Sequence, residues 1–543
     1  MRWVALALIC ALAAALRLVD LGAVRLDPFY DAAVRSMGLS WHNFFFGAYE
    51  PGGSVSIDKP PIDLWLQVAS VKLFGWGSTS LKLPEALAGT AAVPLLYAAI
   101  RRPFGTIAGL VAALALAVLP IEVISARSDT MDAVMMLLLV LALLFVVRAS
   151  ETGATLWLLA AAAALGVAFN VKLLESVVAL PGLLMLACLG LPISGQKAAR
   201  RSRRAWQLAA AAATYVAVSL LWLGATLVFP AHERPYAIGS TNGSAWNAAF
   251  VFNGTERLSG KTVEVSQASN SPSHSDGGGE STTTGTPPIT PPSPTRLLAR
   301  KGQLPAKWLG WEALAALLLG VAVVVCVLRG KAGRLKRATA IGVFLWLLTG
   351  LVLFSAMARL HPRYVESFTP AVAAMFGIGV ALVAGLGSRA RLLAIPLTAL
   401  LAIPLVASIE AVEAKTSDAG NIGALNPVEQ KALSSYLLAH QGGARYELAA
   451  GSSTSVASLI VGDQKPVLML TTYNGMPFTS VARLKALIAR GAVRYAFLDS
   501  QCSRSAAKTS AGCAPAALWI RAHASDVSRQ AGLRGRGLLW RLP

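Results

Sequence analysis

The residues best suited to chemistry lie in one stretch near the start of the chain, between Arg25 and Trp65. This stretch separates two apolar segments, yet it is rich in carboxylates, cations and aromatic side chains. A plain connector between membrane helices needs only a few polar residues. Carboxylates can move protons and cations can bind anions, so we interpret the stretch as part of a binding site. Its aspartates are Asp27, Asp31, Asp58 and Asp63.

The first half of the stretch predicts a capped helix. Apolar and aromatic residues recur at helical spacing from Phe29 to Trp41, which indicates a short helix lying on the membrane surface. Asp27 and Asp31 are four residues apart and would repel each other on one helical face. We therefore expect Asp27 to precede the helix as its N-cap, a structural role that competes with a catalytic one.

The second half contains Asp58 and Lys59, followed by two prolines and another apolar segment. Paired prolines fix an extended turn ahead of a new helix. That turn would present Asp58 and Lys59 at the depth of the lipid headgroups. A lysine held there can bind a phosphate, although so short a motif has little specificity by itself.

Further polar patches occur where other apolar segments end. Asp132 lies at the edge of an apolar run, where an ionisable side chain is a functional candidate by default; an ion pair with Arg127 is the structural alternative. Lys172 is either a phosphate ligand or a lysine that reaches out to the membrane surface. Two more connections supply four further polar residues, Asn242, His361, Arg363 and Tyr364. Of these, Asn242 and His361 are candidates for binding the substrate.

Composition indicates that membrane helices position these residues. Of the 543 residues, 55% are hydrophobic and only 14% are charged, whereas soluble proteins carry about a quarter of charged residues. The apolar residues form runs of about 20, long enough to cross a bilayer as helices. The sequence predicts about eleven spans, at 3–20, 83–100, 104–121, 129–147, 155–170, 173–191, 206–229, 308–328, 339–358, 365–386 and 392–409.

Charge predicts the orientation of these spans. Every second connection is basic, and lysine and arginine mark cytoplasmic connections. The N-terminus is then cytoplasmic, the C-terminus is exoplasmic, and the polar patches all face the exoplasm, where we expect them to share one cavity. The net charge of +21 thus reflects orientation and a weak attraction to anionic membrane lipids, not binding of nucleic acid. The basic connections contain Arg101 and Arg102; Arg148; Lys197, Arg200, Arg201, Arg203 and Arg204; Arg329, Lys331, Arg334, Lys336 and Arg337; and Arg389 and Arg391.

Two soluble parts are predicted outside the membrane. The loop 230–307 begins with residues able to bind sugar hydroxyls and continues into a Ser/Thr/Gly/Pro-rich insert, 259–295, that we expect to be disordered. The tail 424–543 alternates strands and helices and predicts a small parallel α/β sheet, with a capped helix that starts at Asn426. Cys502 and Cys513 lie in this exoplasmic tail, where a disulfide can persist, although two free thiols are the alternative.

Taken in order, several of these stretches resemble the GT-C membrane glycosyltransferases. The resemblance is to the protein-mannosyltransferase and aminoarabinose-transferase-like superfamily, glycosyltransferase family 39, and within it to the bacterial mannosyltransferase branch. It predicts a polytopic α-helical membrane protein with the GT-C fold over residues 1–410, a catalytic exoplasmic loop at 21–82, and a C-terminal exoplasmic α/β domain. The matching motifs, specific in this order and topology, are DPFYDAAVRSM, SWHNFFFG, DKPPIDLW, LPEALAG, RSDTMD, FNVKLLES, RPYAIGSTNGS, HPRYVESFTP, TTYNG and GAVRYAFL.

The resemblance implies an enzyme of the bacterial plasma membrane that takes a sugar from a polyprenyl-phosphate carrier. The sugar would go, with inversion, to an unidentified cell-envelope acceptor on the exoplasmic face. Asp27 is the implied general base; the family often has Asp-Glu where this chain has Asp27-Pro28, so Asp31 and Asp58 remain rivals. Asp132 matches the second acidic position. The positions that match near the donor phosphate are Lys59 and Lys172, with Arg127, Arg363 and Tyr364 as neighbours.

This chemistry needs no cofactor. A lipid phosphate leaves as an anion, so cations rather than an acid must stabilise its growing charge. No His/Cys/Asp cluster in the sequence has a specific metal-ligand spacing, so we expect no metal, although Asp27 or Asp132 could hold a divalent ion. Two other classes stay open. One is a flippase or transporter of lipid-linked sugars, which would place charges at mid-membrane; the other is a non-catalytic membrane sensor, for which the acidic first loop is superfluous.

Overall fold

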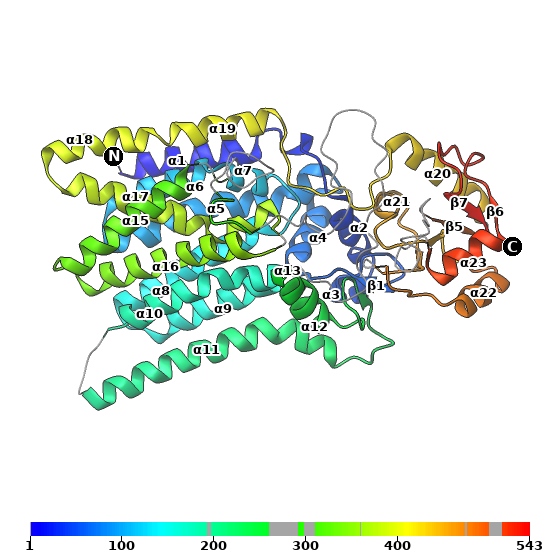
Figure 1. Ribbon diagram of the computed structural model, residues 1–543, viewed down its shortest axis with the longest axis horizontal. Coiled ribbons are helices and arrows are strands. Elements are labelled where there is room, and N and C mark those ends of the chain that lie inside the picture. The colour runs from blue at the N-terminus through cyan, green and yellow to red at the C-terminus, as the bar shows by residue number, and fades with distance from the viewer. Residues whose placement is uncertain are drawn as a thin grey trace. The chain divides into compact units, whose positions relative to one another are not determined.

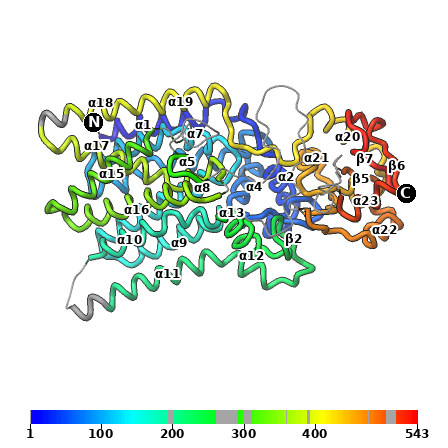
Figure 2. The backbone as a smooth tube through the Cα atoms, in the orientation of Figure 1, coloured from blue at the N-terminus to red at the C-terminus, as the bar shows by residue number. Residues whose placement is uncertain are grey.

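The computed structural model describes residues 2–192, 197–259, 292–297, 309, 311–358, 360–472, 475–498 and 513–543. Residues 260–291 of the insert predicted to be disordered lie outside this part, as does Cys502 of the predicted disulfide; Cys513 is buried. The chain folds into two compact units (Figures 1 and 2). Unit 1 contains Met1–Arg25, Gly75–Gly224 and Thr290–Asp418, and unit 2 contains Leu26–Phe74, Ala225–Ile289 and Ala419–Pro543.

Unit 1 is built from long apolar helices that lie side by side (Figure 1). Within the described residues, nine helical segments are long and apolar enough to cross a membrane, or ten if a bent pair counts as one span. The prediction of a multi-pass membrane protein is therefore confirmed. The helices are α1 (Arg2–Leu18), α5 (Ser78–Phe104), α6 (Thr106–Val118), α7 (Pro120–Ala126), α8 (Asp132–Thr152), α9 (Thr155–Lys172), α10 (Leu180–Gly190), α11 (Lys197–Leu227), α15 (Glu312–Arg329), α16 (Arg334–Ala356), α17 (Thr369–Gly385), α18 (Ser388–Ala399) and α19 (Ala402–Glu413), with short 3₁₀ segments η1 (Leu21–Ala23), η2 (Leu173–Ala179) and η4 (Pro362–Phe368).

One of these segments, Thr155–Gly190, runs out through α9 and returns through η2 and α10. A Cβ added at Gly190 would meet the side chain of Ser150, and one added at Gly153 would meet the ring of Pro192. The end of α10 therefore lies beside the chain that precedes α9, so α10 runs antiparallel to α9, and this one segment contains the two predicted spans 155–170 and 173–191.

The bent pair consists of α6 and α7, which meet at 59°. Pro120 starts α7, and the residue before it, Leu119, has extended backbone angles (φ −67°, ψ 121°). A proline disfavours helical angles in the residue that precedes it and cannot donate a hydrogen bond to the previous turn. The chain therefore breaks at this point and α7 takes a new direction.

Three of the basic connections meet at one end of unit 1. Arg102, at the end of α5, donates to Glu151 at 2.7 Å, and Arg334, at the start of α16, donates to the backbone carbonyl of Ser150 at 3.1 Å. Glu151 and Ser150 both lie in the last turns of α8. The connections that follow α5, α8 and α15 thus lie together, as the alternation of charge along the sequence predicts.

Unit 2 begins with the acidic stretch. Asp27 caps α2 (Pro28–Met37), and its Oδ1 accepts from the Phe29 N–H at 3.1 Å, which confirms the predicted cap. The two prolines of the second half precede α4 (Ile62–Phe74), again as predicted. The remaining elements of this part are α3 (Trp41–Phe46), the parallel pair β1 (Val55–Ser56) and β2 (Tyr236–Ala237), and the helical turns α12 (Ala245–Asn247), η3 (Ala248–Thr255) and α13 (Glu256–Ser259).

The tail contains a five-stranded sheet in the order β4-β3-β5-β7-β6. The sequence predicts strands at 446–450, 467–470 and 493–498, and these are present as β3 (Ala449–Ala450), β4 (Leu468–Met469) and β5 (Tyr495–Phe497), which pair in parallel. The sheet is mixed rather than wholly parallel, because β6 (Ser525–Asp526) and β7 (Leu539–Arg541) add an antiparallel edge. These strands of two and three residues are too short to show an alternating pattern. The helices are α20 (Pro427–His440), α21 (Ala457–Asp463), α22 (Val481–Ala489) and α23 (Pro515–His523), and Asn426 caps the first of them.

Two polar contacts tie the acidic stretch to the tail within unit 2. The buried carboxylate of Glu50 accepts from the N–H groups of Gly52 and Ser54, each at 2.6 Å, and from Val467 at 3.3 Å. Arg35, on α2, donates to the Val461 carbonyl at 3.2 Å. A loop that would otherwise depend on the membrane for support is thus held by the sheet domain.

Candidate functional site

Three of the predicted polar patches come together in unit 1. Lys172, the last residue of α9, donates to Asp132 at the start of α8 and lies 3.0 Å from Glu175. The Arg363 guanidinium lies 4.0 Å from Asp132 and 3.7 Å from Asp418. We call Asp132, Lys172, Glu175, Arg363 and Asp418 the membrane-end cluster. The cluster joins residues from four segments, which the alternating topology predicts should end on one side.

The position of Lys172 depends on an unusual turn. Leu173 has φ 53° and ψ −131°, a left-handed backbone that costs a non-glycine residue about 1–3 kcal/mol. This turn ends α9 and starts η2, so Glu175 and Asp132 can both contact the Lys172 ammonium. Strain of this kind concentrates at functional sites, which supports a role for Lys172 beyond packing.

The η4 segment supplies the other side of the cluster. Its Arg363 and Tyr364 are followed by Ser367, whose carbonyl accepts from the Trp346 indole at 2.9 Å. The Lys172 ammonium lies 5.5 Å from the centre of the Tyr364 ring, and the His361 ring lies 5.8 Å from the same ring. Lys172, Arg363, Tyr364 and His361, all predicted site residues, are therefore neighbours.

Asp418 is a member of the cluster that the sequence did not single out. It follows α19, is 6% exposed, and accepts from the Thr130 hydroxyl at 3.1 Å. Burial raises its pKa to about 6, with Asp132 adding to the rise and Arg363 opposing it. Asp418 lies in the connection between the last membrane helix and the tail, 291 residues after Arg127. No local sequence motif marks it there.

Arg127 does not join the cluster. It is 1% exposed, and its guanidinium donates to the backbone carbonyls of Leu16 at 3.2 Å and Val19 at 2.6 Å, at the end of α1. No ion pair links it to Asp132 in the part of the chain that the structure describes. The structural alternative of an Arg127–Asp132 pair is therefore wrong, and Arg127 serves to hold α1.

A second cluster forms in unit 2 around Asp58. Lys59 donates to both carboxylate oxygens of Asp58, at 2.8 and 2.9 Å, and Arg257 lies 3.9 Å away. Asn253 donates to the Asp58 carbonyl at 2.8 Å and accepts from Arg257 at 3.1 Å. We call Asp58, Lys59, Asn253 and Arg257 the loop cluster. It holds two cations and one carboxylate, a net positive charge that favours an anion.

The cations of the loop cluster also shape the ionisation of Asp58. Burial alone would raise the pKa of its carboxyl group, but Lys59 and Arg257 outweigh burial and hold the pKa below its ordinary value. A carboxylate that is so easily ionised is a weak proton acceptor. Asp58 is therefore better suited to hold Lys59 in place than to act as a base.

Sequence reasoning did not single out Asn253 and Arg257 as site residues. They lie on η3 and α13, next to the insert predicted to be disordered. The η3 segment is a π-helix, a form that is rare and is found frequently at functional sites. Composition drew attention to the polar insert, whereas the useful signal was the short Asn253-to-Arg257 spacing of four residues just before it.

The predicted base, Asp27, is buried and oriented by two backbone donors. Its Oδ1 accepts from Phe29 at 3.1 Å and its Oδ2 accepts from Gly420 at 2.8 Å. Its rival Asp31, one turn along α2, is also buried and lies close enough to Arg35 to influence it electrostatically. The cap and the Gly420 contact explain why the Asp27 carboxylate is oriented.

Asn242 is a turn residue in the structure. Its side-chain oxygen accepts from the Ser244 N–H at 3.0 Å, and the residue is exposed. As for a metal, the described residues contain no group of three or more His, Cys, Asp or Glu side chains that could hold one. Asp27 and Asp132, the two carboxylates considered for a divalent ion, are engaged by N–H and ammonium donors.

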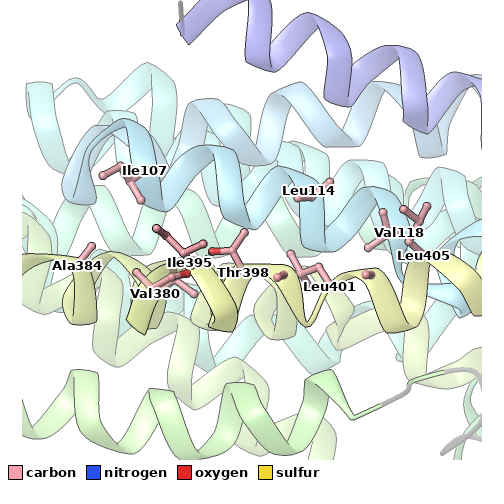
Figure 3. A pocket seen from close by; sticks show the side chains of 12 residues that line it. Ile107, Leu114, Val118, Val380, Ala384, Ile395, Thr398, Leu401 and Leu405 are labelled. Atoms are coloured by element: carbon pink, nitrogen blue, oxygen red, sulfur yellow. Dashed lines mark hydrogen bonds between the residues drawn. The ribbon is translucent and has the colours of Figure 1, made fainter. Parts of the chain in front are cut away.

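An apolar groove of about 660 Å³ opens between α6, α17, α18 and α19. Ile107, Leu114 and Val118 of α6 face Val380 of α17 and Leu405 of α19 across it (Figure 3). None of the charged residues of the membrane-end cluster lines this groove. Apart from the hydroxyl of Thr398, its walls are hydrocarbon and suit a lipid chain.

Two regions of the chain match known families. Residues 58–231 match the family described as dolichyl-phosphate-mannose-protein mannosyltransferase. Residues 433–523 match the family described as "Putative mannosyltransferase YkcB-like, C-terminal". The first region contains Asp58, Lys59, Asp132 and Lys172, and the second lies within the sheet domain.

Two curated relatives from Bacillus subtilis (strain 168), YycA and YkcB, are both named putative mannosyltransferases. YycA is 35% identical over 241 residues, which are 44% of this chain and 34% of YycA. YkcB is 37% identical over 235 residues, which are 43% of this chain and 32% of YkcB. The matched part of this chain thus spans about a third of the length of either relative.

Two solved structures share the fold. ArnT from Cupriavidus metallidurans, bound to undecaprenyl phosphate, has a TM-score of 0.52 and 17% identity, over 86% of this chain and 85% of ArnT. The oligosaccharyltransferase AglB from Archaeoglobus fulgidus, in complex with an inhibitory peptide and a dolichol-phosphate, has a TM-score of 0.53 and 12% identity, over 97% of this chain and 72% of AglB. The resemblance stated from the sequence is confirmed: the chain has the GT-C membrane fold that these structures share, and its residues 58–231 match the family described as dolichyl-phosphate-mannose-protein mannosyltransferase.

Proposed function

We propose that the protein is an inverting glycosyltransferase that moves a sugar from a polyprenyl-phosphate donor to an acceptor hydroxyl on the exoplasmic face of the membrane. The observation that carries the proposal is the membrane-end cluster, in which Lys172 and Arg363 converge on Asp132 at the ends of membrane helices. Two cations at that depth can reach a phosphate whose lipid tail stays in the bilayer.

The chemistry of the donor explains why cations matter. When the bond between sugar and phosphate breaks, the phosphate takes the bonding electrons and becomes more negative. Donors fixed in a partly dry site stabilise that charge better than water does, because they need not reorganise. Lys172 and Arg363 are 4% and 13% exposed at their side chains, which meets this condition. Lys59 and Arg257 of the loop cluster supply the same chemistry in unit 2.

The acceptor hydroxyl must lose its proton as it attacks the anomeric carbon. We assign this step to Asp27, because its carboxylate is buried and is oriented by two backbone donors, the N–H groups of Phe29 and Gly420. Asp58 is a poorer base because Lys59 and Arg257 favour its ionised form. Asp31 remains a rival, because it lies one turn from Asp27 on α2 and is equally buried.

The side of the membrane follows from charge. The basic connections meet at the end of unit 1 where α5 and α8 end, and such connections remain in the cytoplasm. The membrane-end cluster lies at the start of α8 and the end of α9, hence at the exoplasmic ends. The lipid phosphates in the ArnT and AglB structures support a lipid-linked donor.

The test uses purified full-length protein in nanodiscs and a panel of radiolabelled polyprenyl-phosphate sugars. Release of polyprenyl phosphate is followed in wild type, in Asp27→Asn and in Asp20→Asn, a matched change at an aspartate whose left-handed backbone (φ 52°) asparagine tolerates. We expect release with one sugar, lost in Asp27→Asn and kept in Asp20→Asn. Three results together would instead support a transporter. A donor would bind equally well to wild type and to Asp27→Asn, no variant would release polyprenyl phosphate, and the lipid would move across the bilayer.

A further inference from the structure

The tail is strongly basic, although the rule that explains the basic connections between membrane helices does not apply to it. Residues 424–543 contain 14 lysines and arginines but only five aspartates and glutamates, a net charge of +9 out of the +21 of the whole chain. Lysine and arginine orient membrane helices when they lie in short loops close to the ends of the spans, whereas large domains cross largely regardless of their charge. The charge of the tail therefore needs another explanation.

Five exposed cations of the tail gather at one edge of its sheet. The parallel strands β3, β4 and β5 all start at this edge, and β7 ends there, because Arg541 is the register partner of Tyr495. The N–H of Leu542, the next residue, donates to the carbonyl of Arg494 at 2.9 Å. We call the cations that lie within five residues of these strand ends the basic edge; they are Arg445, Lys465, Arg490, Arg494 and Arg541.

The basic edge is not balanced by ion pairs in the part of the chain that the structure describes, since none of its five cations forms one there. Lys465 faces Glu447, but Glu447 is 1% exposed and burial raises its pKa to about 9, so it is uncharged at neutral pH. The other carboxylates described in the tail accept hydrogen bonds from neighbouring N–H or O–H groups; they are Glu429, Asp463 and Asp526. The edge therefore presents its positive charge to solvent.

Two arginines of the basic edge are supported by their surroundings. The Arg494 guanidinium lies against the backbone of Gly442, where an added Cβ would come within 2.7 Å of its Nη1. The Arg445 guanidinium lies 5.3 Å from the centre of the Tyr446 ring. Side chains held in this way lose less freedom when a ligand binds. A planar guanidinium also offers paired N–H donors that match the oxygens of a carboxylate or a phosphate.

The surroundings of the basic edge favour one class of polyanion. The edge runs across four adjacent strands, about 15 Å, so a polymer with repeated negative charges can contact several cations at once. Binding to a lipid surface also needs apolar side chains that enter the bilayer, but the exposed large apolar side chains of the described tail lie on α20 and α23. Single-stranded nucleic acid stacks on exposed aromatic rings, and no Phe, Tyr or Trp of the described tail is exposed. The apolar side chains are Val428, Leu438 and Leu518.

We propose that the basic edge is a docking surface for an acidic polysaccharide, a chain of sugars that carries carboxylate or phosphate groups. The place of this polymer outside the membrane rests on the proposed function, which puts the tail in the exoplasm, whereas the binding chemistry does not. A polymer held at the basic edge stays close to the enzyme, which raises the local concentration of acceptor hydroxyls.

Binding is tested with full-length protein in phosphatidylcholine nanodiscs, which carry no net charge. The probes are three fluorescent dextrans of equal length, one neutral, one carboxymethylated and one phosphorylated. We expect wild type to bind at least one acidic dextran and to ignore the neutral one. The double variant Arg494→Gln/Arg541→Gln should weaken that binding about tenfold, because it removes two charge-assisted contacts. Arg534→Gln/Arg536→Gln, a matched change at two exposed arginines outside the basic edge, should stay within about twofold of wild type.

Four results would overturn the docking surface. They are no binding of either acidic dextran, equal weakening by the two double variants, tighter binding of a short-chain phosphatidylglycerol, and tighter binding of an oligonucleotide with the same number of charges. The last two would assign the basic edge to lipid or to nucleic acid. If the acidic dextrans bind as expected while no polyprenyl-phosphate sugar turns over, the proposed function fails and the docking surface stands. Turnover without any dextran binding gives the reverse.

Discussion

Lys172 and Asp132, forty residues apart in the chain, form a buried ion pair between the end of α9 and the start of α8. Each has a second partner, but the two partners differ. Lys172 also lies 3.0 Å from Glu175, whereas Asp132 has Arg363 at 4.0 Å. The two residues therefore do not depend equally on each other.

This asymmetry predicts unequal effects of substitution. Lys172→Met leaves Asp132 with a distant cation, and an uncompensated buried charge costs about 3–5 kcal/mol of unfolding free energy. Asp132→Asn leaves Lys172 paired with Glu175, so its cost should be smaller. Thermal unfolding in nanodiscs checks the order, with Lys485→Met as a control at a lysine that lies over the Trp519 ring in the tail. Equal unfolding midpoints for Lys172→Met and Asp132→Asn would contradict the asymmetry.

The loop cluster predicts a loss of donor affinity rather than of fold. Lys59 and Arg257 neutralise one Asp58 and leave one positive charge, so removing either cation leaves the cluster neutral. We expect Lys59→Met and Arg257→Met each to raise donor KM about tenfold, the loss of one charge-assisted hydrogen bond to a phosphate. Steady-state kinetics measure it, again with Lys485→Met beside them. An unchanged KM in both variants would remove the loop cluster from the donor site.

Asp418 predicts a pH dependence near neutrality. Its pKa is about 6, raised by burial, so the carboxyl group ionises as the pH increases through that value. Ionisation places a negative charge 3.7 Å from Arg363 and weakens the attraction of the cluster for a phosphate. Donor KM should therefore rise as the pH passes from 5 to 7 in wild type, and Asp418→Asn should keep the low KM throughout. A variant with the same pH profile as wild type would show that another group titrates.

The sequence predicts those features of the fold and the site that depend on residues close together in the chain. The spans follow from runs of apolar residues, and the cap at Asp27 follows from its spacing to Asp31; both predictions hold. Lys172, Arg363 and Tyr364 were found because each interrupts an apolar segment, and the alternation of basic connections placed them at one end.

What the sequence could not give are contacts between distant segments. Arg127 and Asp132 look like partners because they are five residues apart, yet the turn between α7 and α8 sends Arg127 to the carbonyls of α1. Asp418 and Arg257 carry no local motif, and only folding brings them to Arg363 and Asp58. The antiparallel edge of the tail sheet was missed because β6 and β7 are too short for a pattern.

Turnover is expected to survive removal of metal ions. Two carboxylates were considered as metal ligands. Asp27 accepts hydrogen bonds from two backbone N–H groups, and Asp132 accepts one from the Lys172 ammonium. Cations of the protein can replace the charge that a metal would supply. Release of polyprenyl phosphate in EDTA, compared with samples given Mg²⁺ or Mn²⁺, measures this. A loss of activity in EDTA that added Mn²⁺ restores would show that a divalent ion belongs to the site.

The tail predicts a stability change with pH that is separate from any activity. Burial raises the pKa of Glu447 to about 9, and the neighbouring carboxyl group of Asp463 adds to the rise. The folded chain then keeps a proton that the unfolded chain releases above its ordinary pKa of 4.5. This contribution to the free energy of unfolding is complete below about pH 4.5 and is lost as the pH rises to about 9.

Between pH 5 and pH 7 the loss is at most about 3 kcal/mol, because one pKa unit corresponds to about 1.4 kcal/mol. Glu447→Gln keeps the shape of the side chain without a proton to lose, so its unfolding midpoint should be higher than that of wild type at pH 7 and should vary less with pH. Glu413→Gln, at an exposed glutamate, should follow wild type. Only two of the 13 tryptophans, Trp519 and Trp540, lie in the sheet domain, so hydrogen exchange of the peptides that contain them, measured along a thermal ramp, reports this part of the chain. Parallel pH profiles for wild type and Glu447→Gln would mean that Glu447 is ionised in the folded protein, with Lys465 as the counter-charge that favours that form.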